Sequence, residues 1–233
     1  MSIDLYTWPT PNGHKVHILL EELAVSYTVV PVDIVTGEQF APDFLKISPN
    51  NKMPALVDSD GPDGQPITLF ESGAIMIYLA EKFGRFMPED ARGRYTVLQW
   101  VMFQMASIGP MLGQAQHFFQ YAPEGNDYAR NRYSKEAARL YGVVDRRLAE
   151  SPYIAGEDYT IADMAVWPWM KFSHYQGVER EGFPNFLRWY DEIAERPAVR
   201  RGMDVLKDKR RKHTISDDAK AILFGDRQYE RRN

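Results

Sequence analysis

The chain has 233 residues, 44% of them hydrophobic and 26% charged, a length that suggests one or two domains, each with a core of its own. It has no cysteine, which excludes disulfide bonds, cysteine-ligated metal sites and any thiol nucleophile supplied by the protein. Because 28 basic residues stand against 32 acidic ones, the formal charge of −4 argues against a general nucleic-acid binder.

The first 84 residues combine strand and helix patterns. Alternating apolar residues predict a strand over Ile3–Thr7, a cluster of helix breakers occupies residues 8–13, and helical spacing of apolar residues predicts a helix over 14–23. A further strand is predicted at 27–33, and Pro31 within it favours a position at the edge of the sheet. The remaining predicted elements are a helical turn at 42–46, hairpin strands at Ala55–Asp58 and Ile67–Phe70, and a helix at 71–83.

Beyond residue 93 only helical patterns recur. Helices are predicted at residues 94–108, 127–150, 160–174 and 186–195, with prolines between them. The Thr-Ile-Ala-Asp run at 160–163 fits a capping box, in which a hydroxyl and a carboxylate satisfy the first amides of a helix. We therefore expect a mixed α/β domain over residues 1–84 and an all-helical domain over 92–233 that includes a C-terminal extension.

The sequence also bears on membranes and secretion. The longest apolar run, near residues 74–80, is far shorter than the ~20 residues of a bilayer span. The first residues, MSIDLYTW, show neither the basic nor the apolar region of a signal peptide. We expect a cytoplasmic protein with no membrane partner and no nucleic-acid partner.

The turn between the first predicted strand and helix carries the first candidate site. Such a turn opens the crevice of an α/β sheet, where unpaired amides and the positive end of a helix dipole face outward. Thr10 adds a hydroxyl and Asn12 an amide, so the turn is suited to a thiolate or another anion. The alternative is that both residues cap the helix, as Thr and Asn often do, and this motif alone favours capping.

Two further motifs lie beside the predicted hairpin. The Met53-Pro54 bond precedes a strand, and a cis bond there would expose the Met53 amide and carbonyl to an extended peptide, while an ordinary trans proline is the alternative. Glu71 and Ser72 open the next helix, where Ser72 suits a carboxylate and Glu71 an ammonium, although Ser72 alone reads as a plain cap.

Together these motifs match one molecule, the tripeptide glutathione. It has an amino-acid head for Glu71 and Ser72, a cysteine amide for Met53 to pair, and a terminal carboxylate for a cation such as Lys52. The sequence resembles the glutathione transferases, in particular the bacterial Nu class of disulfide-reductase type. The stretches that carry the resemblance are residues 3–15, 47–58, 69–82, 109–114, 159–163 and 167–169.

The resemblance implies a thioredoxin-like first domain, an all-helical second domain, a homodimer, and glutathione as cosubstrate without a metal. It implies that Thr10 and Asn12 contact the glutathione sulfur and that Met53 pairs its cysteine backbone. Arg132 matches a family arginine that reaches the site from the helical domain, the alternative being a solvated helix charge. The residues implied for the remaining polar groups of glutathione are Gln39, Lys52, Glu71 and Ser72.

The absence of cysteine constrains the mechanism, because thiol–disulfide exchange requires a thiolate that attacks a disulfide. Every reacting sulfur must come from ligands. We expect one glutathione thiolate to attack a small disulfide substrate and a second glutathione to complete the reduction. Weak conjugation or peroxide reduction by the same thiolate could accompany this activity. A glutathione-dependent lyase or transferase acting on aromatic ethers or halides, and a non-catalytic interaction module, remain as alternatives.

The acceptor site is expected between the domains, where pockets tend to form. Candidates to line it are Met111, Gln114, Phe118 and Phe119, although such residues at helical spacing more often form core. We interpret His14, His117 and His174 as structural, because no paired carboxylate accompanies them. The basic stretch at 196–212 is interpreted as a solvated helix and tail.

Overall fold

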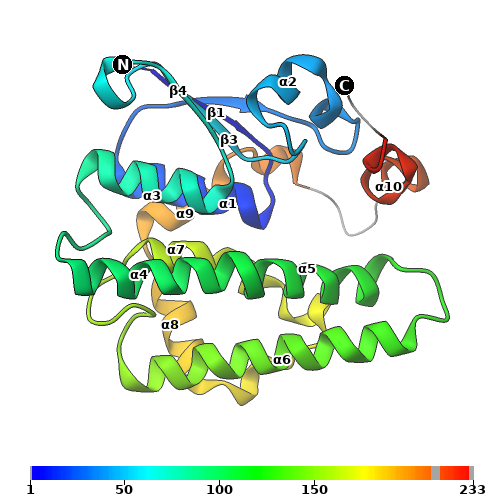
Figure 1. The fold of residues 1–233 in the computed structure, drawn as a ribbon. Coiled ribbons are helices and arrows are strands. Elements are labelled where there is room, and N and C mark those ends of the chain that lie inside the picture. Colours follow the sequence, from blue (N-terminus) through cyan, green and yellow to red (C-terminus); the bar gives the residue numbers. More distant parts are fainter. Residues whose placement is uncertain (1, 211–215, 231–233) are drawn as a thin grey trace. The chain divides into compact units, whose positions relative to one another are not determined.

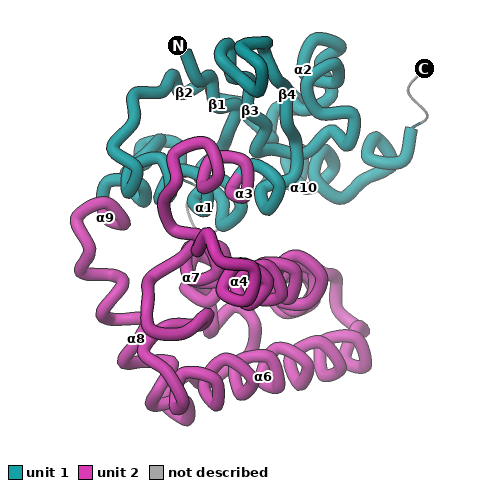
Figure 2. The backbone as a smooth tube through the Cα atoms, turned by 60° about the vertical axis from the view of Figure 1, so that its left-hand side comes forward, with its two compact units in different colours: residues 1–75, 201–233 teal, residues 76–200 magenta. Residues whose placement is uncertain are grey.

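A computed structural model describes residues 2–210 and 216–230 of the chain. The chain divides into two compact units, one formed by residues 1–75 and 201–233 and the other by residues 76–200 (Figure 2). The first unit holds all the strands of the described residues and the second is helical. The predicted order, a mixed α/β region followed by a helical one, is confirmed.

The first unit is built on a mixed four-stranded sheet with the order β2-β1-β3-β4. Its strands are β1 (Ile3–Thr7), β2 (Thr28–Pro31), β3 (Ala55–Asp58) and β4 (Ile67–Phe70). Strand β1 runs parallel to β2 and antiparallel to β3, and β3 and β4 form the predicted hairpin. Pro31 lies on the edge strand β2, where its missing amide proton removes no interior ladder bond.

Helix α1 (Pro11–Leu23) is the most buried helix of this unit and carries an unbroken buried run from Gly13 to Leu20. Helix α2 (Pro42–Ile47) packs on the sheet through Phe44, whose ring lies 6.3 Å from that of Tyr6. Helix α3 (Ser72–Phe83) begins at the end of β4, and the division between the units falls within it, after Ile75. The unit is completed by the end of α9 (Pro197–Asp204) and by α10 (Asp217–Phe224).

The helical unit contains a long rod formed by α4 (Ala91–Phe103), a π-helical turn at Gln104–Ile108 and α5 (Gly109–Gln116). A second π-helical turn, His117–Tyr121, extends it. The rod runs beside α6 (Asp127–Glu150), against which α5 packs (Figure 1). The remaining helices are α7 (Ile161–Val166), a 3-10 segment at Trp167–Gln176, and α8 (Pro184–Ala194).

The capping box predicted at the start of α7 is confirmed. Thr160 accepts a hydrogen bond from the Ala162 amide, and the fully buried Asp163 accepts one from the Thr160 amide at 3.0 Å. Asp163 Oδ1 also accepts from Ile154 N at 2.9 Å and from Trp189 Nε1 at 2.8 Å. This carboxylate therefore joins three segments of the helical core.

Three predicted boundaries are wrong for the same local reason, the position of a proline. Helix α1 begins at Pro11 rather than at residue 14, because proline is well suited to the first helical position. The rod continues through Pro110, which follows a π-helical turn that adjusts the backbone hydrogen bonding. Pro168 instead ends α7 as an α-helix, and a 3-10 segment replaces the rest of the predicted 160–174 helix.

None of the helices within residues 2–210 and 216–230 is both long and apolar enough to cross a lipid bilayer. In the same ranges no group of three His, Asp or Glu side chains is arranged to hold a metal ion.

Candidate functional site

The turn that precedes α1 is a crowded backbone bend. Thr10 has an extended backbone and caps the helix, its Oγ1 accepting from Gly13 N at 3.4 Å. A Cβ on Gly13 would lie 2.2 Å from the carbonyl oxygen of Trp8, so only glycine fits there. The capping role that the sequence offered for Thr10 is therefore present, and it does not exclude a second role for the hydroxyl.

The Thr10 hydroxyl also faces the segment that leads into β3. Its Oγ1 lies 3.6 Å from Met53 Sδ, so two of the predicted glutathione residues are in contact although 43 positions separate them. The Met53-Pro54 bond is cis. Asn12 lies one residue inside α1, at the helix end where free amides and the dipole favour an anion.

A second polar group forms where β4 meets α3. Ser72, at 4% exposure, is the first residue of α3, and Glu71 precedes it with φ of +71°. Glu71 Oε1 accepts a hydrogen bond from Asn50 Nδ2 at 3.5 Å. The Nζ atom of Lys15 donates to Ser72 Oγ at 3.2 Å, which brings a buried cation of α1 to this point.

Lys15 is the residue of this region that the sequence prediction missed. Burial lowers the pKa of its ammonium from 10.5 to about 7, against an opposing attraction from Glu71. A signal was available in the sequence, because Lys15 lies three and four positions before Ile18 and Leu19 and so shares their buried face.

Gln39 and Lys52 supply two further polar groups. Gln39 is 2% exposed and donates through Nε2 to the Ile34 carbonyl at 3.1 Å, while its Oε1 atom is buried without a hydrogen-bond partner in the described chain. An unsatisfied buried oxygen of this kind is suited to a donor on a bound ligand. Lys52 Nζ donates to Gln228 Oε1 at 2.8 Å, a contact with the C-terminal extension that the sequence did not predict.

The buried histidines of α1 form a packing network. Thr7 Oγ1 and His17 Nε2 lie 2.9 Å apart, and the Nδ1 atoms of His17 and His14 lie 3.3 Å apart. Burial, together with the nearby His14, lowers the pKa of His17 well below 6.5, so that its ring is neutral. This arrangement agrees with a structural role for His14.

The other residues of the prediction belong to the helical unit. Arg132 lies on α6, where a guanidinium nitrogen is 3.8 Å from Glu136 Oε2, and its role toward glutathione stays a prediction. Phe118 stacks on Tyr133 with ring centroids 5.3 Å apart. Phe119 is packed against the guanidinium of Arg130 at 4.3 Å from the ring centroid.

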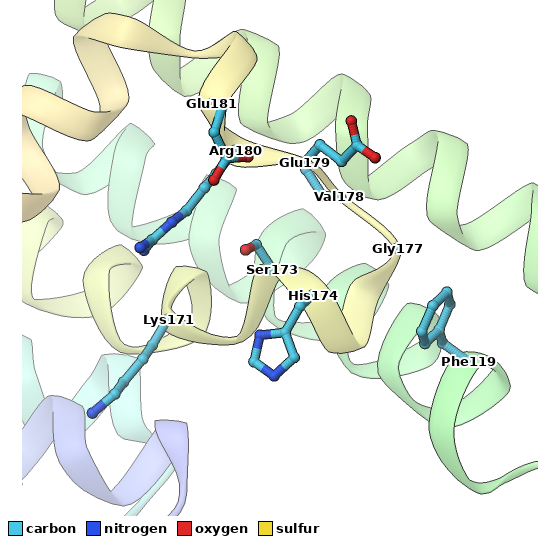
Figure 3. A pocket seen from close by; sticks show the side chains of 9 residues that line it. All are labelled: Phe119, Lys171, Ser173, His174, Gly177, Val178, Glu179, Arg180 and Glu181. Atoms are coloured by element: carbon cyan, nitrogen blue, oxygen red, sulfur yellow. The ribbon is translucent and has the colours of Figure 1, made fainter.

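The helical unit has a cavity of about 670 Å³, lined at one end by Phe119. The side chains of Lys171 and Arg180 extend in the same direction along it, and the Glu179 carboxylate points away from them (Figure 3). Of the residues predicted for the acceptor site, Met111, Gln114 and Phe118 do not line this cavity.

Comparison with protein families matches both parts of the chain. Residues 1–81 match the glutathione S-transferase N-terminal domain, and residues 127–192 match the glutathione S-transferase C-terminal domain. Two similar curated proteins from Escherichia coli K12 are the disulfide-bond oxidoreductases YfcG and YghU. YfcG is 48% identical over 88% of this chain and 95% of its own, and YghU is 42% identical over 86% of this chain and 73% of its own.

Solved structures extend the similarity to three dimensions. A glutathione transferase from Burkholderia graminis with two glutathione molecules bound per subunit is 46% identical and matches with a TM-score of 0.84 over 88% of this chain and 89% of its own. One from Pseudomonas putida with one glutathione disulfide bound per subunit is 42% identical, with a TM-score of 0.82 over 88% and 92%. These likenesses confirm the thioredoxin-like first domain and the helical second domain.

Proposed function

Because the chain belongs to the glutathione S-transferase family, we propose that it is a glutathione-dependent disulfide reductase. One observation carries the proposal: a chain similar to named disulfide-bond oxidoreductases has no cysteine at all. Glutathione must then supply every sulfur that the chemistry needs besides those of the substrate.

The thiolate of the first glutathione is held at the N-terminus of α1. The Thr10 hydroxyl and the Asn12 amide donate to the sulfur, and the positive end of the helix dipole favours its negative charge. A roughly hundredfold larger thiolate fraction requires ~2.7 kcal/mol. Two charge-assisted hydrogen bonds of ~1.5–3 kcal/mol each are sufficient for this.

The reaction proceeds through two exchanges. The thiolate attacks one sulfur of a small disulfide in line, forming a glutathione mixed disulfide and releasing the other sulfur as a thiolate that takes a proton from solvent. A second glutathione thiolate then attacks the glutathione sulfur of that mixed disulfide. The products are glutathione disulfide and two substrate thiols, so two glutathione molecules are oxidised for each disulfide reduced.

The remaining polar groups match the rest of the tripeptide. Met53 presents its backbone to the cysteine residue, Glu71 and Ser72 receive the amino-acid head, and Lys52 attracts the terminal carboxylate. The buried Oε1 of Gln39, which has no partner in the described chain, accepts a ligand N–H. Arg132 adds a cation from the helical domain.

The thiolate assignment is tested by replacing its two donors. Thr10→Ala and Asn12→Ala are expected to lower kcat for a small disulfide by roughly tenfold to a hundredfold each, because each removes a charge-assisted bond. The dissociation constant of S-methylglutathione, which has no thiol, should change much less. Thr10→Ser is the matched control, since it keeps both the hydroxyl and the helix cap.

A double variant with wild-type turnover would remove these residues from the mechanism. The substrate class is tested separately by comparing a small disulfide with a chloronitroaromatic and an aryl ether. We expect the disulfide to be the fastest substrate, and the reverse ranking would identify a transferase or lyase that acts on carbon. Absence of turnover with all three would favour an interaction module.

The protein is also proposed to act as a homodimer in the cytoplasm. Tyr95 and Met102 are seven positions apart on α4, so they share a face, and they are 69% and 50% exposed. Light scattering should give twice the chain mass of 26.9 kDa. A reaction that consumes reduced glutathione needs a compartment that maintains it, which cell fractionation would identify.

A further inference from the structure

Lys15 is placed where lysine rarely occurs in a folded protein. It lies in the buried run of α1 and is only 1% exposed. Burying an ammonium is unfavourable, so fully buried lysines are rare unless a partner or a function retains them. Its Nζ donates a hydrogen bond to Ser72 Oγ at 3.2 Å, at the start of α3.

The surroundings of Lys15 are the polar groups proposed to receive the head of glutathione. Glu71, in the turn between β4 and α3, attracts the ammonium and raises its pKa, whereas burial lowers it, and the result is about 7. On α1 itself the adjacent His14 is the neighbouring titratable group, and it lies 3.3 Å from the neutral His17. Lys15 therefore changes charge near neutral pH.

We propose that Lys15 is a positioning residue for the γ-glutamyl head of glutathione, which fixes the Ser72 hydroxyl and takes up a proton from solvent when the glutamyl α-carboxylate binds. This inference rests on the proposed function. A serine hydroxyl can donate one hydrogen bond and accept two, and the bond from Lys15 occupies one of its acceptor positions. This bond restricts the rotation of the Ser72 side chain, and the incoming negative charge of the ligand stabilises the ammonium form of Lys15.

A positioning role for Lys15 can be distinguished from a packing role by the number of protons exchanged when the ligand binds. A lysine that only fills space could be replaced by methionine, which has similar length, with no change in the protons exchanged during binding. A positioning lysine couples the affinity for the carboxylate to its own protonation. The Lys15→Arg variant distinguishes attraction of the carboxylate from proton uptake. Arginine is permanently charged, so it can attract the carboxylate but cannot take up a proton.

The experiment is calorimetric titration of the full chain with S-methylglutathione at pH 7.5, in two buffers of different ionisation enthalpy. This probe has no thiol, so proton release from sulfur does not contribute. A lysine of pKa about 7 is then mostly neutral before binding. We expect the wild-type protein to take up about 0.7 proton per ligand.

Lys15→Met should bind S-methylglutathione with roughly tenfold lower affinity than the wild type and should take up no proton. Lys15→Arg should also bind S-methylglutathione without taking up a proton. Lys46→Met is the matched control, because Lys46 is an exposed lysine of the same unit paired with Asp43, and its uptake should equal that of the wild type.

Binding to the wild type without proton uptake would overturn the inference and leave the proposed function standing, as would equal uptake by wild type and Lys15→Met. Failure of the wild type to bind the probe would overturn both. Absence of proton uptake by the wild-type protein overturns the inference whether or not Lys15→Met folds, and Lys15→Arg provides a second comparison for the uptake.

Discussion

Among the described residues, each unit buries an ionisable side chain that makes an instructive pair, Asp163 in the helical unit and Lys15 in the other, and the surroundings of the two differ. Asp163 of the helical unit accepts hydrogen bonds from Ile154 N, Thr160 N and Trp189 Nε1, all from its own core. Burial raises its pKa to about 6, and these bonds limit the rise. Lys15 of the other unit donates to a serine at the start of α3, and its pKa falls to about 7.

These different surroundings indicate different roles: Asp163 stabilises the fold, whereas Lys15 is placed to interact with a ligand. The donors around Asp163 are backbone amides and an indole N–H that would be left unsatisfied without it. Lys15 contacts Ser72, beside the exposed Glu71 and the groups proposed to receive glutathione. We therefore expect the removal of Asp163 to destabilise the fold and the removal of Lys15 to affect the ligand.

The largest effect is expected for Asp163→Ala. It leaves the Trp189 indole and two amides buried without acceptors, which should reduce the free energy of unfolding by about 3–5 kcal/mol. The melting midpoint should fall by about 10 °C. Asp158→Ala, at an exposed position of the same unit, is the control. A loss below ~1 kcal/mol would contradict the contrast between the units.

Lys15→Met, in contrast, should increase the free energy of unfolding, and the size of this increase should depend on pH. Below pH 7 Lys15 is protonated in both the folded and the unfolded chain, so the full penalty of burying its charge acts and methionine stabilises. Between pH 7 and 10.5 the folded chain has lost the proton that the unfolded chain keeps, so the wild type gains stability relative to the variant. The advantage of methionine should decrease by about 3 kcal/mol between pH 6 and 9.5.

Denaturant titrations of both proteins at the two pH values measure this change. A constant difference between the proteins across that range would show that Lys15 does not titrate in the folded state.

Gly13→Ala tests whether the turn before α1 is fixed by backbone contact. The added Cβ would meet the Trp8 carbonyl oxygen, which cannot move without the turn, so we expect a loss of about 2 kcal/mol and weaker binding of S-methylglutathione. Gly182→Ala, which meets nothing within 4 Å in the other unit, should be nearly neutral in thermal melts. Equal melting midpoints for the two variants would argue against a rigid turn.

The smallest effect is expected for Gln228→Ala, which releases Lys52 from the C-terminal extension. Without this bond the Lys52 ammonium is less constrained and can approach the terminal carboxylate of glutathione, so the affinity for glutathione disulfide should rise by about twofold, ~0.4 kcal/mol. Calorimetry measures the change, with Gln65→Ala as an exposed glutamine control in the same unit. A weaker affinity would mean that Gln228 supports the site.

The fold followed from the sequence where a local pattern carried enough information. The alternation in Ile3–Thr7 and the capping box at Thr160 depend on neighbours within a few positions, and both are confirmed. Prolines were less predictable, because Pro11 starts a helix, Pro110 lies within a continuous rod and Pro168 ends an α-helix. Backbone hydrogen bonding around each proline decides among these outcomes.

The residues of the candidate site could be predicted only where the residue type and its local motif together indicate a ligand-binding role. Thr10, Met53 and Ser72 were identified from their motifs, and the structure brings Thr10 to Met53. Lys15 was missed because a lysine in a helix normally lies in water, and this general tendency outweighed the spacing that places Lys15 on the same face as Ile18 and Leu19. The Lys52–Gln228 contact joins residues 176 positions apart, beyond any local pattern.

The sequence by itself determined the two-part architecture, the dependence on a ligand's sulfur and most of the residues proposed to hold that ligand. These follow from periodicity, composition and short motifs, which are local properties of the chain. Only the tertiary structure decided which charges are buried and what they face, because burial depends on segments that the chain brings together from far apart. Lys15 and Ser72, 57 positions apart, meet for that reason.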